Sequence, residues 1–191
     1  IPLFAIHKGL LTVEKENKRN IFNGKIMEIE GLPDLKLEQA FELTDATAER
    51  SCAGSTILLS EKTVEEYLKS NVCLLEKMIN SNYQDAQSIK RRIKDMQDWL
   101  KNPTLIKPDK NAIYEEILEI DLAKVDQPIV ACPNDPDNVK ELSEVCNTNI
   151  DEVFIGSCMT NIGHYRAAAK VLEGASLLKA KLWICPPTKM D

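Results

Sequence analysis

The spacing of apolar residues divides the chain into a helical first part and a strand-rich last part. Apolar residues three and four positions apart predict amphipathic helices over residues 61–80 and 85–100. Ser60 can cap the first of these, and together they predict a helical hairpin. Shorter helices are expected over residues 1–11 and 37–53. Short apolar runs predict two strands in the same part of the chain, at residues 26–29 and 56–59.

Beyond Tyr114 the pattern changes to short, continuous apolar runs with helical stretches between them. Strands are expected at residues 117–122, 128–132, 153–155 and 182–185, and helices at residues 139–145 and 165–172. Such alternation is typical of a parallel α/β sheet. We therefore expect an α/β fold with two domains, residues 1–123 and residues 124–191.

The stretch from Val153 to Arg166 places a thiol where a predicted strand ends and a helix begins. In an open α/β sheet, ligands bind beyond the carboxyl ends of the strands, and the start of the next helix offers free N–H groups. Cys158 could therefore meet a ligand or a metal there. A cysteine near a strand end is, however, more often a small buried packing residue. Position alone leaves both interpretations open.

The residues around this thiol add a second observation. Residues 156–164 read Gly-Ser-Cys-Met-Thr-Asn-Ile-Gly-His, which resembles the loop of the aconitase family whose Cys is one of three thiolates holding a 4Fe-4S cluster. The wider family has a Ser-Cys-Thr-Asn form of this loop. With Met159 inserted after the Cys, the loop resembles the form found in the bacterial B branch of the family. The resemblance covers almost the whole chain, with further matching segments at residues 9–15, 29–36, 40–46, 133–137 and 186–191.

This resemblance implies a fold and an activity for a longer protein. The fold would be the flavodoxin-like, three-layer α/β architecture of the aconitase iron-sulfur core domains, of which this chain is a part. The activity would be that of a 4Fe-4S hydro-lyase of the tricarboxylic acid cycle, which interconverts citrate and isocitrate through cis-aconitate; B-type enzymes also dehydrate 2-methylisocitrate. The chain lacks an initiating Met and ends just after a predicted strand. We therefore expect an internal segment that needs the remaining domains of its parent chain and is inactive alone.

The resemblance also implies roles for individual residues. Cys158 would be a metal ligand, one thiolate of the cluster. Glu28 would be catalytic, because its segment Met-Glu-Ile-Glu-Gly aligns with a family segment whose glutamate reaches the water or hydroxyl on the open iron. Thr160 and Asn161 would bind the substrate. The residues themselves also allow simpler interpretations. Glu28 could be an exposed acid on a half-buried strand, with Glu30 as a rival for any role, and the other two could cap the following helix.

Three cysteines stand at predicted strand ends, so one chain could in principle hold a cluster by itself: Cys132, Cys158 and Cys185. We reject this arrangement, because aconitases take their other two cluster ligands from a later Cys-x-x-Cys and this sequence contains none. Cys132 and Cys185 are interpreted as packing or incidental residues. The 4Fe-4S cluster is therefore expected in the full-length protein, with two ligands outside this chain, and not in the chain alone.

Composition narrows the classes of partner. The 191 residues are 43% hydrophobic and 28% charged, as in ordinary globular proteins, and carry a net charge of −6. This charge argues against broad binding to DNA, RNA or anionic membranes. A long apolar run and a signal peptide are both lacking, which predicts a cytoplasmic protein. The basic run at residues 90–94 is interpreted as a solvated helix face. Two alternatives stay open for function: a cluster-free form that binds messenger RNA, and an inert scaffold.

Overall fold

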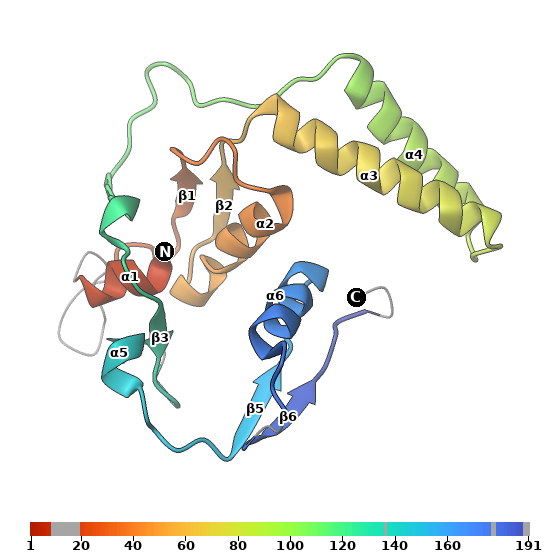
Figure 1. Ribbon diagram of the computed structural model, residues 1–191. Helices are drawn as coiled ribbons and strands as arrows, with labels where there is room; N and C mark the ends of the chain where they lie inside the picture. Colours follow the sequence, from red (N-terminus) through yellow and green to blue (C-terminus); the bar gives the residue numbers. More distant parts are fainter. Residues whose placement is uncertain (9–19, 136, 177–178, 189–191) are drawn as a thin grey trace. The chain divides into compact units, whose positions relative to one another are not determined.

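The computed structural model describes residues 1–8, 20–135, 137–176 and 179–188, and Figure 1 shows the order of its helices and strands. Some sequence predictions fall on residues outside these ranges: the end of the N-terminal helix, the matching segment at residues 9–15, Pro136 and residues 189–191.

The chain forms two compact units. One is Gly24–Glu115, and the other combines Ile1–Asn23 with Glu116–Asp191. The predicted domain limits at residues 123 and 124 stay a prediction.

The unit Gly24–Glu115 begins with a strand–helix–strand motif. β1 (Ile26–Ile29) and β2 (Gly54–Ile57) pair in parallel, with Glu28 opposite Thr56. α2 (Leu37–Asp45) and a short 3-10 turn, η2 (Ala48–Arg50), connect them. The backbone ladder continues on both sides, from Ala53 N to Lys25 O at 2.8 Å and from Leu58 N to Ile29 O at 2.9 Å. The second strand therefore begins at residue 54, earlier than the apolar run alone predicted.

The helix predicted over residues 37–53 ends at Asp45, so the prediction was wrong beyond that residue. Two threonine hydroxyls there donate to backbone carbonyls: Thr44 Oγ1 to Ala40 O at 3.0 Å, and Thr47 Oγ1 to Thr44 O at 2.7 Å. Side chains that bond the backbone compete with a continuing helix. Ser51 then adopts a left-handed conformation with φ of 61°, which turns the chain toward β2.

The two longest helices confirm the predicted hairpin. α3 spans Glu61–Asn80 and α4 spans Ala86–Lys101. Ser60 Oγ accepts a hydrogen bond from Thr63 N at 3.3 Å and caps α3, as its position predicted. Leu75 of α3 and Ile89 of α4 are buried, and the two helices contact each other along their length (Figure 1). The apolar stripe therefore serves the packing of one helix on the other.

The other unit is built around the N-terminal helix. α1 (Pro2–His7) buries Ala5 and Ile6 against a hairpin of two strands, β3 (Ile129–Ala131) and β4 (Val139–Glu141). The short helix α5 (Leu142–Val145) follows β4 directly. Four partly buried apolar residues pack against the two buried residues: Leu3, Phe22, Ile120 and Val139.

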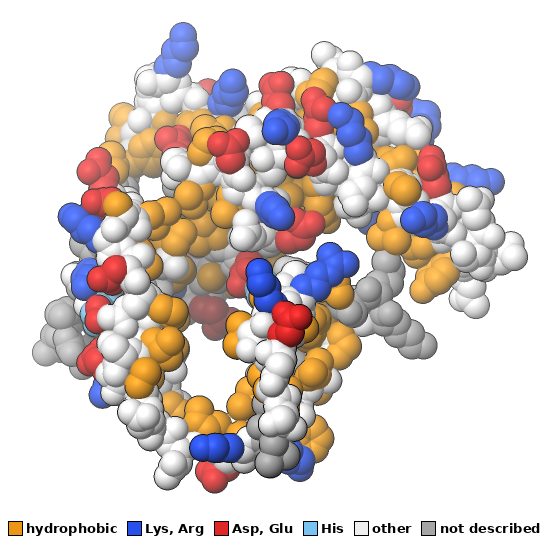
Figure 2. All heavy atoms as spheres, in the orientation of Figure 1, with side chains coloured by type: hydrophobic (Ala, Val, Ile, Leu, Met, Phe, Trp, Pro, Cys, Tyr) orange, Lys and Arg blue, Asp and Glu red, His pale blue; other side chains and the backbone are white. Residues whose placement is uncertain are grey.

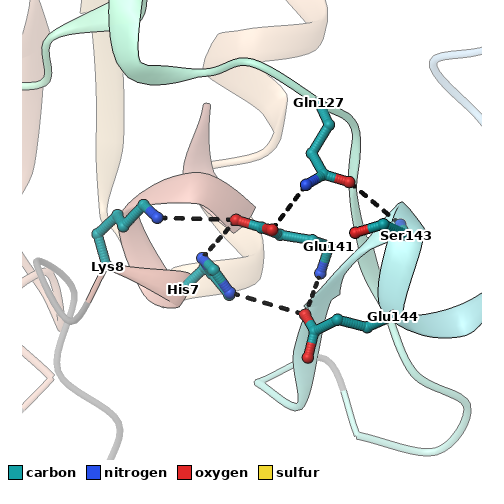
Figure 3. A network of polar contacts seen from close by, with 6 residues as sticks. All are labelled: His7, Lys8, Gln127, Glu141, Ser143 and Glu144. Carbon is teal, nitrogen blue, oxygen red and sulfur yellow. Dashed lines mark hydrogen bonds and ion pairs between the residues drawn. The ribbon is translucent and has the colours of Figure 1, made fainter.

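A polar network also joins α1 to the β4–α5 segment (Figure 3). The ring nitrogens of His7 lie 3.9 Å from Glu141 Oε1 and 4.0 Å from Glu144 Oε2. Lys8 Nζ lies 3.7 Å from Glu141 Oε1, and Gln127 Nε2 donates to Glu141 Oε2 at 2.7 Å. These contacts link residues that are far apart in sequence, which explains why the first residues of the chain belong with its last part.

One helix prediction and one strand prediction in this unit were wrong. Residues 139–145 were expected to be one helix, but Val139–Glu141 pairs antiparallel with β3 and only Leu142–Val145 is helical. Asn134, with φ of 65°, and a bond from Cys132 N to Asn138 O at 2.7 Å close the hairpin turn between the strands. Burial alternates along β4, with Lys140 exposed between two partly buried residues, as expected for a strand. The segment is too short for its sequence pattern to distinguish a strand from a helix.

Residues 117–122 were expected to be a strand, and the structure shows none there. Asp121 Oδ1 instead accepts a hydrogen bond from Ala123 N at 3.1 Å and caps a 3-10 turn, η3 (Leu122–Lys124). A short apolar run becomes a strand only when a partner strand completes its hydrogen bonds. The described residues provide no such partner for this run.

The end of the chain forms a second strand–helix–strand motif. β5 (Glu152–Ile155) and β6 (Lys181–Ile184) pair in parallel, with Val153 opposite Leu182, and α6 (Ile162–Leu172) connects them. This confirms the predicted parallel pairing for the last two strands, whereas β3 pairs with β4 in a separate sheet. The chain is therefore a mixture of helices and small sheets.

The β5–β6 sheet exposes large apolar side chains (Figure 2). Phe154 is 63% exposed, Trp183 45% and Ile184 57%. An apolar hollow of about 240 Å³ lies between this sheet and α6, lined by residues that include Ile155 and Leu172. Parallel sheets in folded proteins are normally covered on both faces. These two strands therefore have the composition of a buried sheet while standing partly uncovered.

Candidate functional site

Cys158 lies on a tight turn between β5 and α6. Thr160 N donates to Ser157 O at 3.2 Å, and the hydroxyls of the same two residues are 3.0 Å apart. Met159 N also donates to Ser157 Oγ, at 3.3 Å. The side chain of Cys158 is exposed. The turn therefore presents the thiol outward from the carboxyl end of β5, and the burial expected of a packing cysteine is not observed.

Asn161 caps the helix that follows. Its Oδ1 accepts a hydrogen bond from Gly163 N at 2.9 Å, and its backbone N–H donates to His164 Nδ1 at 3.1 Å. This reciprocal arrangement is a capping box, and it fixes the orientation of the first turn of α6. Asn161 thus has the capping role that the sequence allowed. The substrate-binding roles of Thr160 and Asn161 stay a prediction.

Gly156 allows the turn to approach β6. A Cβ atom added to this glycine would lie 2.5 Å from the carbonyl oxygen of Cys185, well inside van der Waals contact. Cys185 N also donates to Ile155 O at 2.9 Å, so the two backbones are held together at this point. The side-chain-free residue therefore permits the close packing that positions the turn.

We expect Gly156→Ala to lower the free energy of unfolding by about 1–3 kcal/mol, because a backbone carbonyl cannot move aside as a flexible side chain does. Chemical denaturation followed by circular dichroism measures this change. Gly54→Ala in β2 is the matched control, since its Cβ would meet no atom within 4 Å. Equal stability of the two variants would show that the contact between Gly156 and Cys185 does not constrain the turn.

The cysteines do not gather into a metal site. Among the described residues, no group of three or more His, Cys, Asp or Glu side chains could hold a metal ion. Cys132 follows β3, which belongs to a different sheet from β5, and Cys185 follows β6. An exposed thiol on a tight turn fits the role of one cluster ligand. The role of Cys158 as a cluster ligand stays a prediction.

Glu28 lies on the exposed face of β1 and has a partner that the sequence did not reveal. The phenol hydroxyl of Tyr114 donates a hydrogen bond to Glu28 Oε2. This bond, together with burial and the negative charges of Glu28 and Glu30, raises the pKa of Tyr114 to about 12. No spacing rule links residues 28 and 114. The sequence offered only a single tyrosine in the segment that follows α4 as a sign of this contact. The catalytic role of Glu28 stays a prediction.

Glu28 and Cys158 belong to different compact units. Each is exposed in its own unit. Glu28 lies on β1, which pairs in parallel with β2, and Cys158 lies on the turn after β5, which pairs in parallel with β6.

The basic run on α4 is exposed, and Lys94 within it is paired with an acid. Asp98 forms ion pairs with Lys94 and, at 2.8 Å, with Lys101. Hydrogen bonds from these two lysines lower the pKa of Asp98 to about 2. This arrangement is that of a solvated helix face carrying both charge signs, as the sequence predicted. In the described part of the chain, no helix has both the length and the apolar character required to cross a membrane.

Comparison with known proteins places the chain among aconitases. No protein-family model matches it. It is similar to aconitate hydratase B of Synechocystis sp., at 64% identity over 191 residues, and of Escherichia coli, at 57% identity over 192 residues. Both matches cover all of this chain, which spans 22% of the length of each relative.

A more distant similarity points to the same core. The 3-isopropylmalate dehydratase large subunit of Clostridium kluyveri is 30% identical over 155 residues, which is 81% of this chain and 30% of that subunit. The names of both groups describe hydro-lyases, enzymes that add or remove water. Because the identity of 54–64% to aconitate hydratase B relatives extends over the whole chain, the chain belongs to the aconitate hydratase B family.

Proposed function

We propose that this chain is part of an aconitate hydratase that interconverts citrate and isocitrate through cis-aconitate. The observation that carries the proposal is the 64% identity over all 191 residues to a relative of that name. The exposed thiol of Cys158 on the β5–α6 turn supports it. Since the chain spans 22% of the relatives' length, other groups needed for the reaction would come from the remaining domains of the protein.

Cys158 would be one of three thiolate ligands of a 4Fe-4S cluster in that protein. When bound, such a cluster with one open iron supplies a Lewis acid that polarises the C–O bond of the substrate hydroxyl. The hydrogen bonds between Ser157 and Thr160 would fix the backbone of the turn that carries the thiol. The Cys158 side chain is exposed on this turn, so a ligand can reach it. Thr160 and Asn161 would lie beside the substrate carboxylates at the start of α6.

Glu28 would exchange the proton that accompanies the hydroxyl. In dehydration its carboxyl group would give a proton to the departing hydroxyl, which leaves as water, and in hydration it would take a proton back from water. Its exposed position on β1 supports this role, since substrate and water can reach it.

The finer features of the family belong to the same proposal. The two parallel strand–helix–strand motifs, β1–α2–β2 and β5–α6–β6, support the flavodoxin-like layering of a complete core. The full-length protein would be a cytoplasmic enzyme of the tricarboxylic acid cycle, and it would also accept 2-methylisocitrate. The chain alone would be inactive.

The test is a chimeric enzyme, in which this chain replaces the matching segment of the Escherichia coli relative, 57% identical to it. After anaerobic loading with iron and sulfide, we expect the chimeric enzyme to convert citrate to isocitrate and the 191-residue chain to bind little iron and show no turnover. The unaltered relative is the reference. A folded, iron-loaded chimeric enzyme without turnover would contradict the proposal, and so would turnover by the chain alone.

A further inference from the structure

The connection that follows α4 returns to β1 through two neighbouring contacts. Tyr114 OH donates to Glu28 Oε2, and the next residue, Glu115, forms an ion pair with Lys25 Nζ at 2.7 Å. Long connections without secondary structure are uncommon in compact proteins and are usually functional or linker segments. These paired contacts show that one point of this connection is fixed beside the strand that carries Glu28.

The hydrogen bond restricts a side chain that would otherwise be free to rotate. Glu28 is exposed on β1, and an exposed glutamate loses considerable rotamer freedom when one orientation is imposed. A phenol on two rotatable bonds is a stiff donor, and its bond to an ionised carboxylate is charge-assisted. Among the described residues, Tyr114 is the hydrogen-bond partner of Glu28, and it occupies Oε2 only. Oε1 is therefore available to a ligand.

We propose that Tyr114 is a positioning residue for Glu28, whose phenol holds Oε2 so that Oε1 meets the reacting hydroxyl or water in one fixed orientation. This inference rests on the catalytic role proposed for Glu28. Tyr114 transfers no proton and touches neither substrate nor cluster in this scheme. Its effect is geometric, and small displacements of a catalytic group are costly to the rate.

The phenol stays a donor throughout the working pH range. The pKa of Tyr114 is raised from 10.0 to about 12, so the neutral phenol is the form that the folded chain favours. The contact is consequently complete below pH 10 and is lost as the pH rises through about 12. At neutral pH its contribution to catalysis is therefore independent of pH.

The kinetic test uses Tyr114→Phe in the chimeric enzyme. We expect kcat to fall about 10-fold with KM and bound iron unchanged, because the loss concerns orientation of a reacting group and not substrate binding. Tyr83→Phe is the matched control, since that tyrosine is 52% exposed in the turn between α3 and α4. In a Glu28→Gln background, Tyr114→Phe should cause no further loss, as two residues that act as one unit require.

A second readout needs no activity. The tyrosinate absorbance of the 191-residue chain is titrated from pH 8 to 13, and the Tyr114 signal is obtained by subtracting the Tyr114→Phe variant. Tyr114 should ionise near pH 12 in the unaltered chain and nearer pH 10 after Glu28→Gln. Ionisation near pH 10 in the unaltered chain would overturn the contact itself.

The outcomes separate the two proposals. If Glu28→Gln leaves kcat unchanged, the catalytic role of Glu28 fails, and the role of Tyr114 fails with it. If Glu28→Gln lowers kcat but Tyr114→Phe does not, or if the two losses multiply in the double variant, only the positioning role of Tyr114 is overturned. A fall in bound iron after Tyr114→Phe would assign the residue to folding and would also overturn it.

Discussion

Replacing Cys158 by Ala in the chimeric enzyme is expected to lower kcat by at least about 100-fold and to reduce bound iron in parallel. Loss of a residue that only supports a metal ligand already costs 10–100-fold in affinity or activity, and removal of a ligand should cost more. The thiol is exposed on a turn held by backbone and hydroxyl bonds of its neighbours. The substitution should therefore leave the fold intact. Iron analysis, the visible absorbance of the cluster and turnover of citrate measure the effect.

Cys185→Ala is the matched control for this variant. Cys185 is also an exposed cysteine, it follows the neighbouring parallel strand, and its described contacts are made by backbone atoms. We expect it to retain iron and activity. If Cys185→Ala lost iron as completely as Cys158→Ala, the interpretation of Cys185 as an incidental residue would be wrong. Full activity of Cys158→Ala would remove this residue from the cluster.

Glu28→Gln is expected to lower kcat of the chimeric enzyme by about 10²–10⁴-fold, the range for removal of a general acid–base group. The amide has nearly the shape of the carboxylate but cannot exchange the proton. Because the side chain is exposed on a strand whose backbone pairing is unaffected, stability should change little. Steady-state kinetics together with thermal unfolding separate the loss of chemistry from a loss of folded protein.

Glu30→Gln tests the specificity of this result. Glu30 is the neighbouring acid in the same segment and was the rival for the catalytic role, and its charge also acts on Tyr114. We expect the Glu30 variant to stay within about 3-fold of the unaltered enzyme, the effect of one lost surface charge. A large loss for Glu30→Gln with little loss for Glu28→Gln would exchange the two assignments.

The parts of the fold that sequence predicts well are those specified by local residues. The limits of α3 follow from an apolar stripe and a capping serine at residue 60, and both lie within the helix or next to it. β5 and β6 are short apolar runs that are separated by a single helix and pair in parallel. By contrast, residues 139–145 hold too few residues to show a period, and their partner strand decides their structure.

The candidate site divides in the same way. Cys158 and Asn161 lie within one short loop, so local pattern and resemblance identify them together, and the structure adds the exposed thiol and the helix cap. Tyr114 could not be predicted to contact Glu28, because that contact joins residues 86 positions apart in sequence. A single sequence carries no signal for such a pair unless the path of the connection between them is known.

Two contacts join the base of the helical hairpin to the β1–β2 motif, one before α3 and one after α4. Ser60 N donates to Pro33 O at 2.7 Å where α3 leaves the β1–β2 motif, and Tyr114 returns to Glu28 where the connection comes back. Between these two anchors the chain leaves the β1–β2 motif and returns to it, and the first turns of α3 also contact α2, where the ring centroids of Phe41 and Tyr67 are 5.7 Å apart. Insertions or deletions at the tip, around Asn82, would leave both anchors in place. Evolution can therefore lengthen, shorten or decorate this hairpin without displacing the carboxylate at its base.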